Sequence, residues 1–143
     1  MSTTAIGLAS NPVRSPFSAE LQSSGQLDPG RSWFDGNGVW HLRGQVSVGT
    51  ITGGINGQVR ITQNMNLDIS TFSGNIQVKA VITADSGAVY DMFACVTIEN
   101  MMLSGIFTIH GTGGLRGTHM MGIIGGVAGG VATLNGYQFT PRQ

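Results

Sequence analysis

The sequence predicts an all-β protein, an antiparallel up-and-down β-barrel of about eight strands with an extended N-terminal arm. The main observation is the stretch Ile55–Ile69, where every second residue is apolar or small, Gln63 excepted, and every residue between is polar. A period of two indicates a β-strand with one buried and one wet face. Turn signals separate further stretches of this kind at intervals of roughly ten residues, which is typical of a sandwich or a barrel.

The length of this stretch favours the barrel. At roughly 3.3 Å per residue it would reach about 50 Å if straight. It must therefore bend, tilt around a barrel, or break near Asn64. A closed barrel also removes exposed strand edges, so we expect closure rather than a sandwich.

Composition is consistent with one β domain over residues 1–143. Charged residues make up only 10% of the chain, against about 25% in ordinary soluble proteins, and 23 residues are glycine. The formal net charge is zero, which favours assembly. The basic residues are scattered, which argues against nucleic acid as a partner. Residues 1–16 contain Pro12 and Pro16 and are predicted to be an irregular arm.

The remaining strands follow from turns and alternation. Asp28–Gly30 and Asp35–Gly38 are turn sequences. The predicted strands are 17–27, 39–50, 76–83, 88–98, 101–110, 118–128 and 130–139, with a bulge or tight turn allowed at Asn135–Gly136. Within 39–50 the alternation predicts one face made of Trp40, Leu42, Gly44, Val46 and Val48, and another made of His41, Arg43, Gln45 and Ser47.

Membrane insertion and secretion are not expected. The segment Met120–Leu134 is almost wholly apolar, but fifteen residues fall short of the ~20 that cross a bilayer, and its glycines weaken a helix. The strands also lack the aromatic girdles of membrane barrels. Met1–Ser10 has neither a cationic start nor an apolar core, and the single Cys95 favours a reducing compartment, so we expect the cytoplasm.

The last third of the chain has strands that are apolar on both faces. In the predicted strand 101–110, apolar residues occupy both faces, among them Met101, Met102, Ile106 and Phe107. Strands of this kind are buried on both sides, either under the N-terminal arm or in a subunit interface. We expect a homo-oligomer, with an interface formed by Met101, Met102, Met121 and Ile123.

The segment Gly111–Gly117, with the sequence GTGGLRG, follows the strand that ends in His110. It resembles the G-T-G-x-L/F-x-G segment of the allene oxide cyclase and dirigent superfamily, over about residues 100–122. The resemblance implies an eight-stranded antiparallel barrel, often dimeric or trimeric. Some members bind apolar ligands inside and guide a cyclisation or coupling. Gly111, Gly113 and Gly117 are structural in this motif, so it argues for the fold and not for an activity.

Candidate site residues fall into two groups. Trp40, Met65, Tyr90 and Phe107 are expected to line an interior cavity, or else to fill a solid core. Glu99 and His110 are candidate acid–base groups, and Glu99 requires its strand face to point inward. That face also carries Asp91, Phe93 and Cys95, and the more apolar opposite face favours an outward direction.

No metal or other cofactor is expected, because His41, His110 and His119 have no metal-ligand spacing and Cys95 offers one thiolate.

Two functions remain. The first is a barrel that binds an apolar small molecule, with a cyclisation or isomerisation steered by shape as an extension. The alternative is a non-enzymatic, self-assembling subunit. The sequence leaves open whether the protein is an enzyme.

Overall fold

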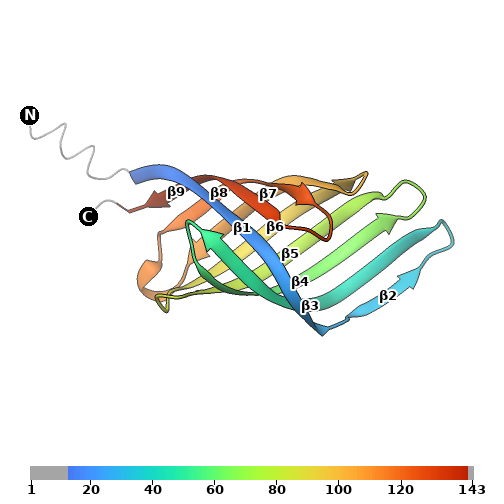
Figure 1. Ribbon diagram of the computed structural model, residues 1–143, viewed down its shortest axis with the longest axis horizontal. Coiled ribbons are helices and arrows are strands. Elements are labelled where there is room, and N and C mark those ends of the chain that lie inside the picture. Colours follow the sequence, from blue (N-terminus) through green and yellow to red (C-terminus); the bar gives the residue numbers. More distant parts are fainter. Residues whose placement is uncertain (1–12, 142–143) are drawn as a thin grey trace, which may run out of the picture.

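The computed structural model describes residues 13–141, which form a closed antiparallel barrel of eight strands with one extra strand (Figure 1). The strands are β1 (Val13–Asp28), β2 (Arg31–Phe34), β3 (Val39–Gly53), β4 (Gly57–Asp68), β5 (Ser73–Ala84), β6 (Val89–Glu99), β7 (Met102–Gly111), β8 (His119–Val127) and β9 (Ala132–Thr140). A short 3₁₀ turn, η1 (Gly113–Leu115), lies between β7 and β8. The predicted fold class is confirmed.

The barrel is closed by β1, which crosses its wall diagonally (Figure 1). From β3 to β9, each strand pairs with the next along the chain. The segment Val13–Leu21 of β1 pairs with β9, and the segment Ala19–Asp28 pairs with β3. Only Ala19–Leu21 pairs on both sides, so the closing seam is narrow.

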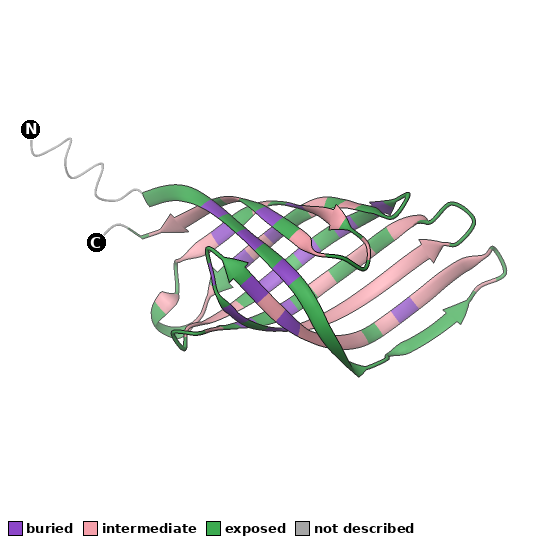
Figure 2. Cartoon of the chain, in the orientation of Figure 1, coloured by how far each residue is buried: buried purple, intermediate pink, exposed green. Residues whose placement is uncertain are grey.

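The extra strand β2 continues the course of β1 along β3. Asp28 is opposite Val46, and after the bend at residues 29–30 Arg31 is opposite Arg43. We call β2 together with Val39–Arg43 of β3 and Met65–Asp68 of β4 the extension, because it projects at the end of the barrel away from the start of β1 and the end of β9 (Figure 1). Most of its residues are exposed or half-buried, whereas the buried residues gather in the middle of the barrel (Figure 2).

The core depends on a row of paired residues that crosses four strands. Phe17 is opposite Gly136, Gly136 is opposite Gly122, and Gly122 is opposite Phe107. A Cβ atom at either glycine would collide with the neighbouring strand's backbone. The two glycines therefore let β8 and β9 approach closely, and the flanking rings of Phe17 and Phe107 have centroids 6.1 Å apart.

One predicted alternation is wrong, because β3 carries a β-bulge. Leu42 is opposite Met65 but Gln45 is opposite Gln63, so β3 has one more residue than β4 between these pairs. Gly44 occupies the bulge with a φ of +70°, and its N–H donates to Asn64 Oδ1 at 2.9 Å. A bulge residue reverses the direction of all the side chains beyond it.

The consequence is that the two faces of β3 exchange after the bulge. Gln45 and Ser47 pair with the inward-facing Gln63 and Ile61, so they belong to the inner face with Leu42. Val46 and Val48 belong to the outer face. The sequence-based assignment of these four residues was reversed.

The predicted strand ends also need correction. β1 begins at Val13, and Pro16 is opposite Tyr137, so residues 13–16 of the expected arm belong to a strand. The rest of that arm, residues 1–12, lies outside the described residues.

Further along the chain, β4 runs through Asn64 without a break, and β9 runs through Asn135–Gly136 without a turn. Met101 belongs to the β6–β7 turn, with a φ of +66°, and not to β7. Within residues 13–141, the structure contains no helix of the length and apolar character needed to span a bilayer.

Candidate functional site

The interior of the barrel contains a cavity of about 390 Å³ next to the extension. Its size is within the range of small-molecule sites, roughly 300–1,000 Å³. The lining residues are Leu21, Gln22, Ser23, Ser47, Ile61, Gln63, Met65, Ile76, Val78, Met92, Val96, Ile98, Leu103, Ile124 and Ala128–Ala132. We call this space the mouth cavity.

Small residues at inward positions explain why this half of the barrel is hollow. Gly105 lies opposite Val96 and Ile124, and Gly126 lies opposite Leu103 and Ala132. Neither glycine has a side chain to fill the interior. The other half of the barrel is filled by large buried side chains, namely Phe107, Ile51, Ile82, Ile109, Met120 and Leu134.

The mouth cavity is bordered by a gap in the barrel wall beside β1. Pairing between β1 and β9 ends where Leu21 lies opposite Ala132. Beyond this point, Gln22 and Ser23 of β1 and the β8–β9 turn, residues 128–131, line the cavity from two sides. The turn is anchored by the Ala128 N–H, which donates to the Met101 carbonyl oxygen at 2.7 Å. The cavity therefore lies beside a stretch of the wall in which β1 and β9 are not paired.

The lining of the mouth cavity is polar on one side only. Gln22, Ser23, Ser47 and Gln63 belong to β1, β3 and β4. The lining residues of β5–β8 are all aliphatic or methionine. Among the described residues, none that lines the cavity is ionisable. The cavity therefore provides hydrogen bonds and apolar contact but no group for acid–base chemistry.

The polar side contains a chain of three amide groups. Gln63 Nε2 donates to Gln45 Oε1, and Gln45 Nε2 donates to Gln26 Oε1 at 2.8 Å. Gln45 takes part only because the bulge at Gly44 turns it inward. This arrangement was missed from the sequence, in which Gln63 is the single polar exception on an apolar face; the glycine at position 44 was the available signal for the bulge.

Of the four residues expected to line a cavity, Met65 lines the mouth cavity. Phe107 is only 1% exposed and packs deeper in the barrel. Tyr90 is half-buried and packs against the core. Trp40 is half-buried at a position opposite Leu67, in the extension. All four occupy inward positions of the register, but three of them do not contact the cavity.

The candidate acid–base residues lie on the outer face, far apart along the strands. Glu99 is exposed and opposite Met102, at one end of the β6–β7 pair. His110 is exposed and opposite Asp91, at the other end. The His110 ring stacks on that of His119 at a centroid distance of 6.0 Å. Across residues 13–141, no cluster of three or more metal-ligating side chains occurs.

The glycine motif forms the loop between β7 and β8, at the end opposite the mouth cavity. Gly113 and Gly117 have φ values of +58° and +98°, which favour glycine. A Cβ at Gly111 would lie 2.5 Å from the Leu115 carbonyl oxygen. Thr112 Oγ1 donates to the Val89 carbonyl oxygen at 2.9 Å and ties the loop to β6. The motif shapes a turn and contributes no residue to the cavity.

A second polar cluster joins the strands of the extension on its outer face. His41 Nε2 is 2.9 Å from Asp35 Oδ2, and His41 Nδ1 is 2.7 Å from Asn66 Oδ1. The Asn66 amide is oriented by Arg43, whose guanidinium donates to Asn66 Oδ1 at 2.8 Å, and by Asn75 Oδ1, which accepts from Asn66 Nδ2. Both ring nitrogens thus face acceptors, an arrangement that only the doubly protonated imidazolium satisfies.

Electrostatics agree with this geometry. The hydrogen bond to Asp35, followed by that to Asn66, raises the pKa of His41. The hydrogen bond from His41 in turn lowers the pKa of Asp35. Trp33 stacks on the His41 ring at 5.2 Å, and Arg31 lies over the Trp33 ring. The cluster contains no hydroxyl or thiol nucleophile, and its hydrogen bonds link the β2–β3 turn to β3 and β4.

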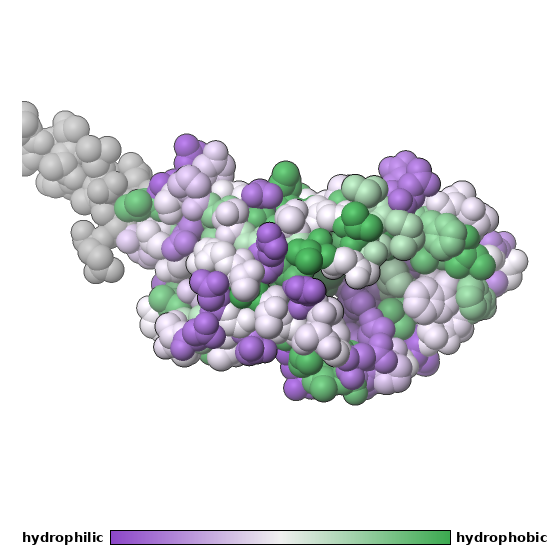
Figure 3. Space-filling view, in the orientation of Figure 1, coloured by the Kyte–Doolittle hydropathy of each residue, from purple (hydrophilic) through white to green (hydrophobic). Residues whose placement is uncertain are grey.

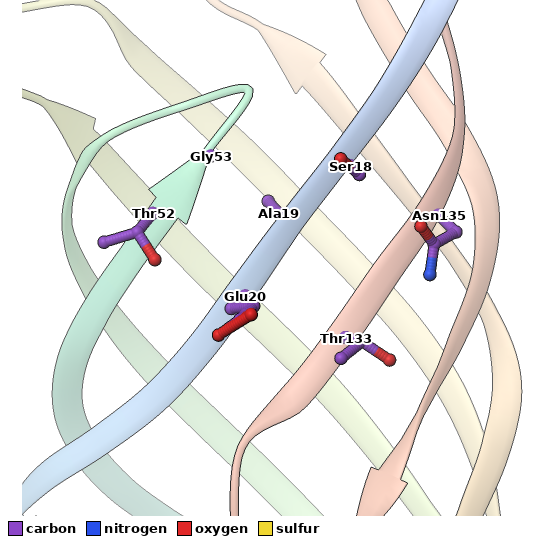
Figure 4. A pocket seen from close by; sticks show the side chains of 7 residues that line it. All are labelled: Ser18, Ala19, Glu20, Thr52, Gly53, Thr133 and Asn135. Atoms are coloured by element: carbon purple, nitrogen blue, oxygen red, sulfur yellow. The ribbon is translucent and has the colours of Figure 1, made fainter.

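The closing seam carries a second hollow on the outside of the barrel, of about 360 Å³ (Figure 4). Glu20 of β1 lies opposite Thr52 of β3 and Thr133 of β9, with Ser18 and Asn135 nearby. Within the described residues, these side chains make no hydrogen bond or ion pair with one another. This hollow is wider open than the mouth cavity, so a small molecule there would lose little contact with water, and we regard the mouth cavity as the candidate site.

Apolar side chains are also exposed on the outer face of β6–β9. Phe93, Met121 and Tyr137 belong to one cross-strand row, and Ile106 and Ile123 to the next. We call these five residues the outer apolar patch; Ile106 and Ile123 are 64% and 63% exposed. The other residues expected at an interface, Met101 and Met102, are also exposed, but the row of Ser104 and Gly125 separates Met102 from the patch. On the face that β1 crosses, by contrast, polar and apolar residues are interspersed (Figure 3).

No family model and no curated protein matches this sequence.

Proposed function

We propose that this barrel binds a neutral, largely apolar small molecule in the mouth cavity. The observation that carries the proposal is a cavity of about 390 Å³ with a mostly aliphatic lining and a gap beside β1. A dry apolar cavity of ~150 Å³ already binds benzene in another protein. The larger volume here accommodates a molecule bigger than a single aromatic ring.

The lining supports binding more directly than catalysis. Because no ionisable described side chain contacts the cavity, a cyclisation or isomerisation of the bound molecule would be steered by the shape of the walls. Kinship with the allene oxide cyclase and dirigent superfamily is proposed from the resemblance at Gly111–Gly117, which implies a barrel of eight antiparallel strands, the fold class of this chain. That kinship is part of the proposal.

The test uses N-phenyl-1-naphthylamine, a neutral dye whose fluorescence rises in apolar surroundings. The wild-type protein is expected to bind it saturably. Leu103→Trp, which fills the cavity from β7, is expected to weaken binding at least about tenfold, or 1.4 kcal/mol. Ser104→Trp is the matched control, because Ser104 is the next residue and is exposed on the outer face. Circular dichroism checks that both variants fold.

Two results would overturn this proposal. One is the absence of saturable dye binding to the wild-type protein. The other is a folded Leu103→Trp variant that binds the dye as tightly as wild type does.

A second function, self-assembly, is favoured by the outer apolar patch. Exposed contiguous apolar side chains on a soluble barrel mark association surfaces. The formal net charge of zero adds no repulsion between copies. We propose that two or more copies associate through β6–β9.

Light scattering after size exclusion tests this assembly. The wild-type protein is expected to elute as an oligomer at micromolar concentration, and the double variant Ile106→Lys with Ile123→Lys as a folded monomer, because charge in an apolar interface is costly. Thr83→Lys, which places the same charge on the polar outer face of β5, should leave the oligomer intact. A wild-type monomer would contradict assembly.

We also propose a cytoplasmic location. The supporting observation is Cys95, which is the single cysteine of the sequence and has an exposed free thiol. Exposed free thiols are characteristic of reducing compartments.

A further inference from the structure

The two-sided lining of the mouth cavity restricts the chemistry of its ligand. Four uncharged polar side chains, Gln22, Ser23, Ser47 and Gln63, belong to one side, and aliphatic or methionine side chains to the other. A pure hydrocarbon would displace water from the polar side without replacing its hydrogen bonds. Each unmet buried polar group costs roughly 1–3 kcal/mol.

The amide chain defines which hydrogen bond is open to a ligand. Gln26 Oε1 accepts from Gln45, and Gln45 Oε1 accepts from Gln63. Gln63 Oε1 is at the end of the chain, and no hydrogen bond between residues 13–141 has it as acceptor. Because no buried side-chain oxygen among these residues lacks a partner, this oxygen is accessible to solvent. Because Gln63 lines the cavity, this oxygen is an acceptor that a ligand donor can reach, beside the hydroxyls of Ser23 and Ser47.

The bulge at Gly44 supports a specific role for this chain. Without the extra residue, Gln45 would face solvent and an outer valine would face the barrel interior. The bulge therefore exchanges an apolar interior position for a polar one, in contact with Gln63. The polar side of the cavity is thus built by the backbone of β3.

The same lining excludes a charged ligand. Lys, Arg, His, Asp and Glu are absent among the described residues that contact the cavity. A carboxylate or ammonium group bound there would lose water without gaining an ion pair, which is costly. The ligand must therefore be neutral.

We infer that the mouth cavity selects a neutral amphipathic alcohol, whose hydroxyl donates to Gln63 Oε1 and whose hydrocarbon part contacts the β5–β8 wall. This inference rests on the proposed binding function and adds the class of ligand. Sites built to hydrogen-bond a hydroxyl strongly reject the analogue that lacks it.

The experiment measures displacement of N-phenyl-1-naphthylamine by three probes of similar size. These are 1-decanol, methyl nonyl ether, which has the same number of heavy atoms but no donor, and decanoate at pH 8. Wild-type protein is expected to bind the alcohol roughly tenfold more tightly than the ether, with decanoate the weakest.

Gln63→Leu removes the acceptor and is expected to bring the affinities for alcohol and ether to within about twofold, chiefly by weakening the alcohol. Gln63→Met, which keeps the length of the side chain, should behave in the same way and serves if the leucine variant does not fold. Gln58→Leu is the matched control, because Gln58 is exposed on the same strand, and it should keep the preference for alcohol.

The outcomes separate this inference from the proposed function. Dye binding with equal affinities for alcohol and ether in the wild type overturns the inference and leaves the binding function standing. A preference for alcohol that survives both Gln63 variants also overturns it. Absence of saturable dye binding overturns both proposals.

Discussion

At the scale of single residues, His41 connects protonation to the stability of the extension. Asp35 and Asn66 raise the pKa of His41 from its ordinary value of 6.5. The stability that protonated His41 adds to the fold is therefore fully present below pH 6.5 and is lost as pH rises through the raised pKa. The pKa of Asp35 is lowered from its ordinary value of 3.8. The stability that the Asp35 carboxylate adds is therefore present above pH 3.8 and is lost as pH falls through the lowered pKa. The His41–Asp35 pair therefore stabilises the fold most between pH 3.8 and pH 6.5.

We therefore expect His41→Gln to reduce the free energy of unfolding more at pH 5.5 than at pH 9. Urea unfolding at the two pH values measures this difference. Asp35→Asn should shift the His41 titration, followed by NMR, back toward the ordinary value. The explanation fails if wild type and His41→Gln show the same pH dependence between these two points.

At the scale of the element, the bulge in β3 needs glycine because of its backbone angle. Gly44 has a φ of +70°, yet nothing lies within 4 Å of where its Cβ would be. Strain, not crowding, therefore opposes a side chain, and Gly44→Ala is expected to cost roughly 1–2 kcal/mol of unfolding free energy. Urea unfolding measures this cost.

Gly36→Ala is the control for this prediction. Gly36 also has open space around it, but its φ is not in the left-handed region. Its substitution should change stability by no more than about 0.5 kcal/mol. Equal effects at the two glycines would show that the bulge conformation is not the source of the cost.

The same strand shows what alternation predicts and where it stops. From β4 to β6 the period of two correctly grouped the residues that share a face, including Gln63, because no bulge interrupts those strands. In β3 one residue in a left-handed conformation reversed the rest of the strand. Alternation is a property of one strand. A bulge depends on how two strands pair, so alternation within one strand does not predict its position.

Pairings between distant segments were also beyond the sequence. The switch of β1 from β9 to β3 at Ala19–Leu21 depends on how the barrel closes, and no local pattern marks it. The mouth cavity depends on this switch and on the empty inward positions at Gly105 and Gly126. Met65 could be placed by alternation, whereas the polar side at Ser47 required the three-dimensional structure.

At the scale of the whole molecule, one wall separates the two proposed functions. On β7, Leu103 faces the mouth cavity and Ile106 faces outward, and on β8 Ile124 faces inward and Ile123 outward. Strand alternation therefore places the proposed ligand surface and the proposed association surface on opposite sides of strands β6–β9. Neither surface requires residues of the other.

This separation predicts that the two activities can be removed independently. Leu103→Trp should lose dye binding and keep the oligomer, whereas the Ile106→Lys and Ile123→Lys double variant should become monomeric and keep the dye affinity of wild type within about twofold, because its side chains point away from the cavity. Dye titration and light scattering on both variants and on their combination measure this. If the monomeric variant instead lost dye binding while its circular dichroism remained that of wild type, association would be holding the cavity open, and the wall would couple the two surfaces rather than separate them.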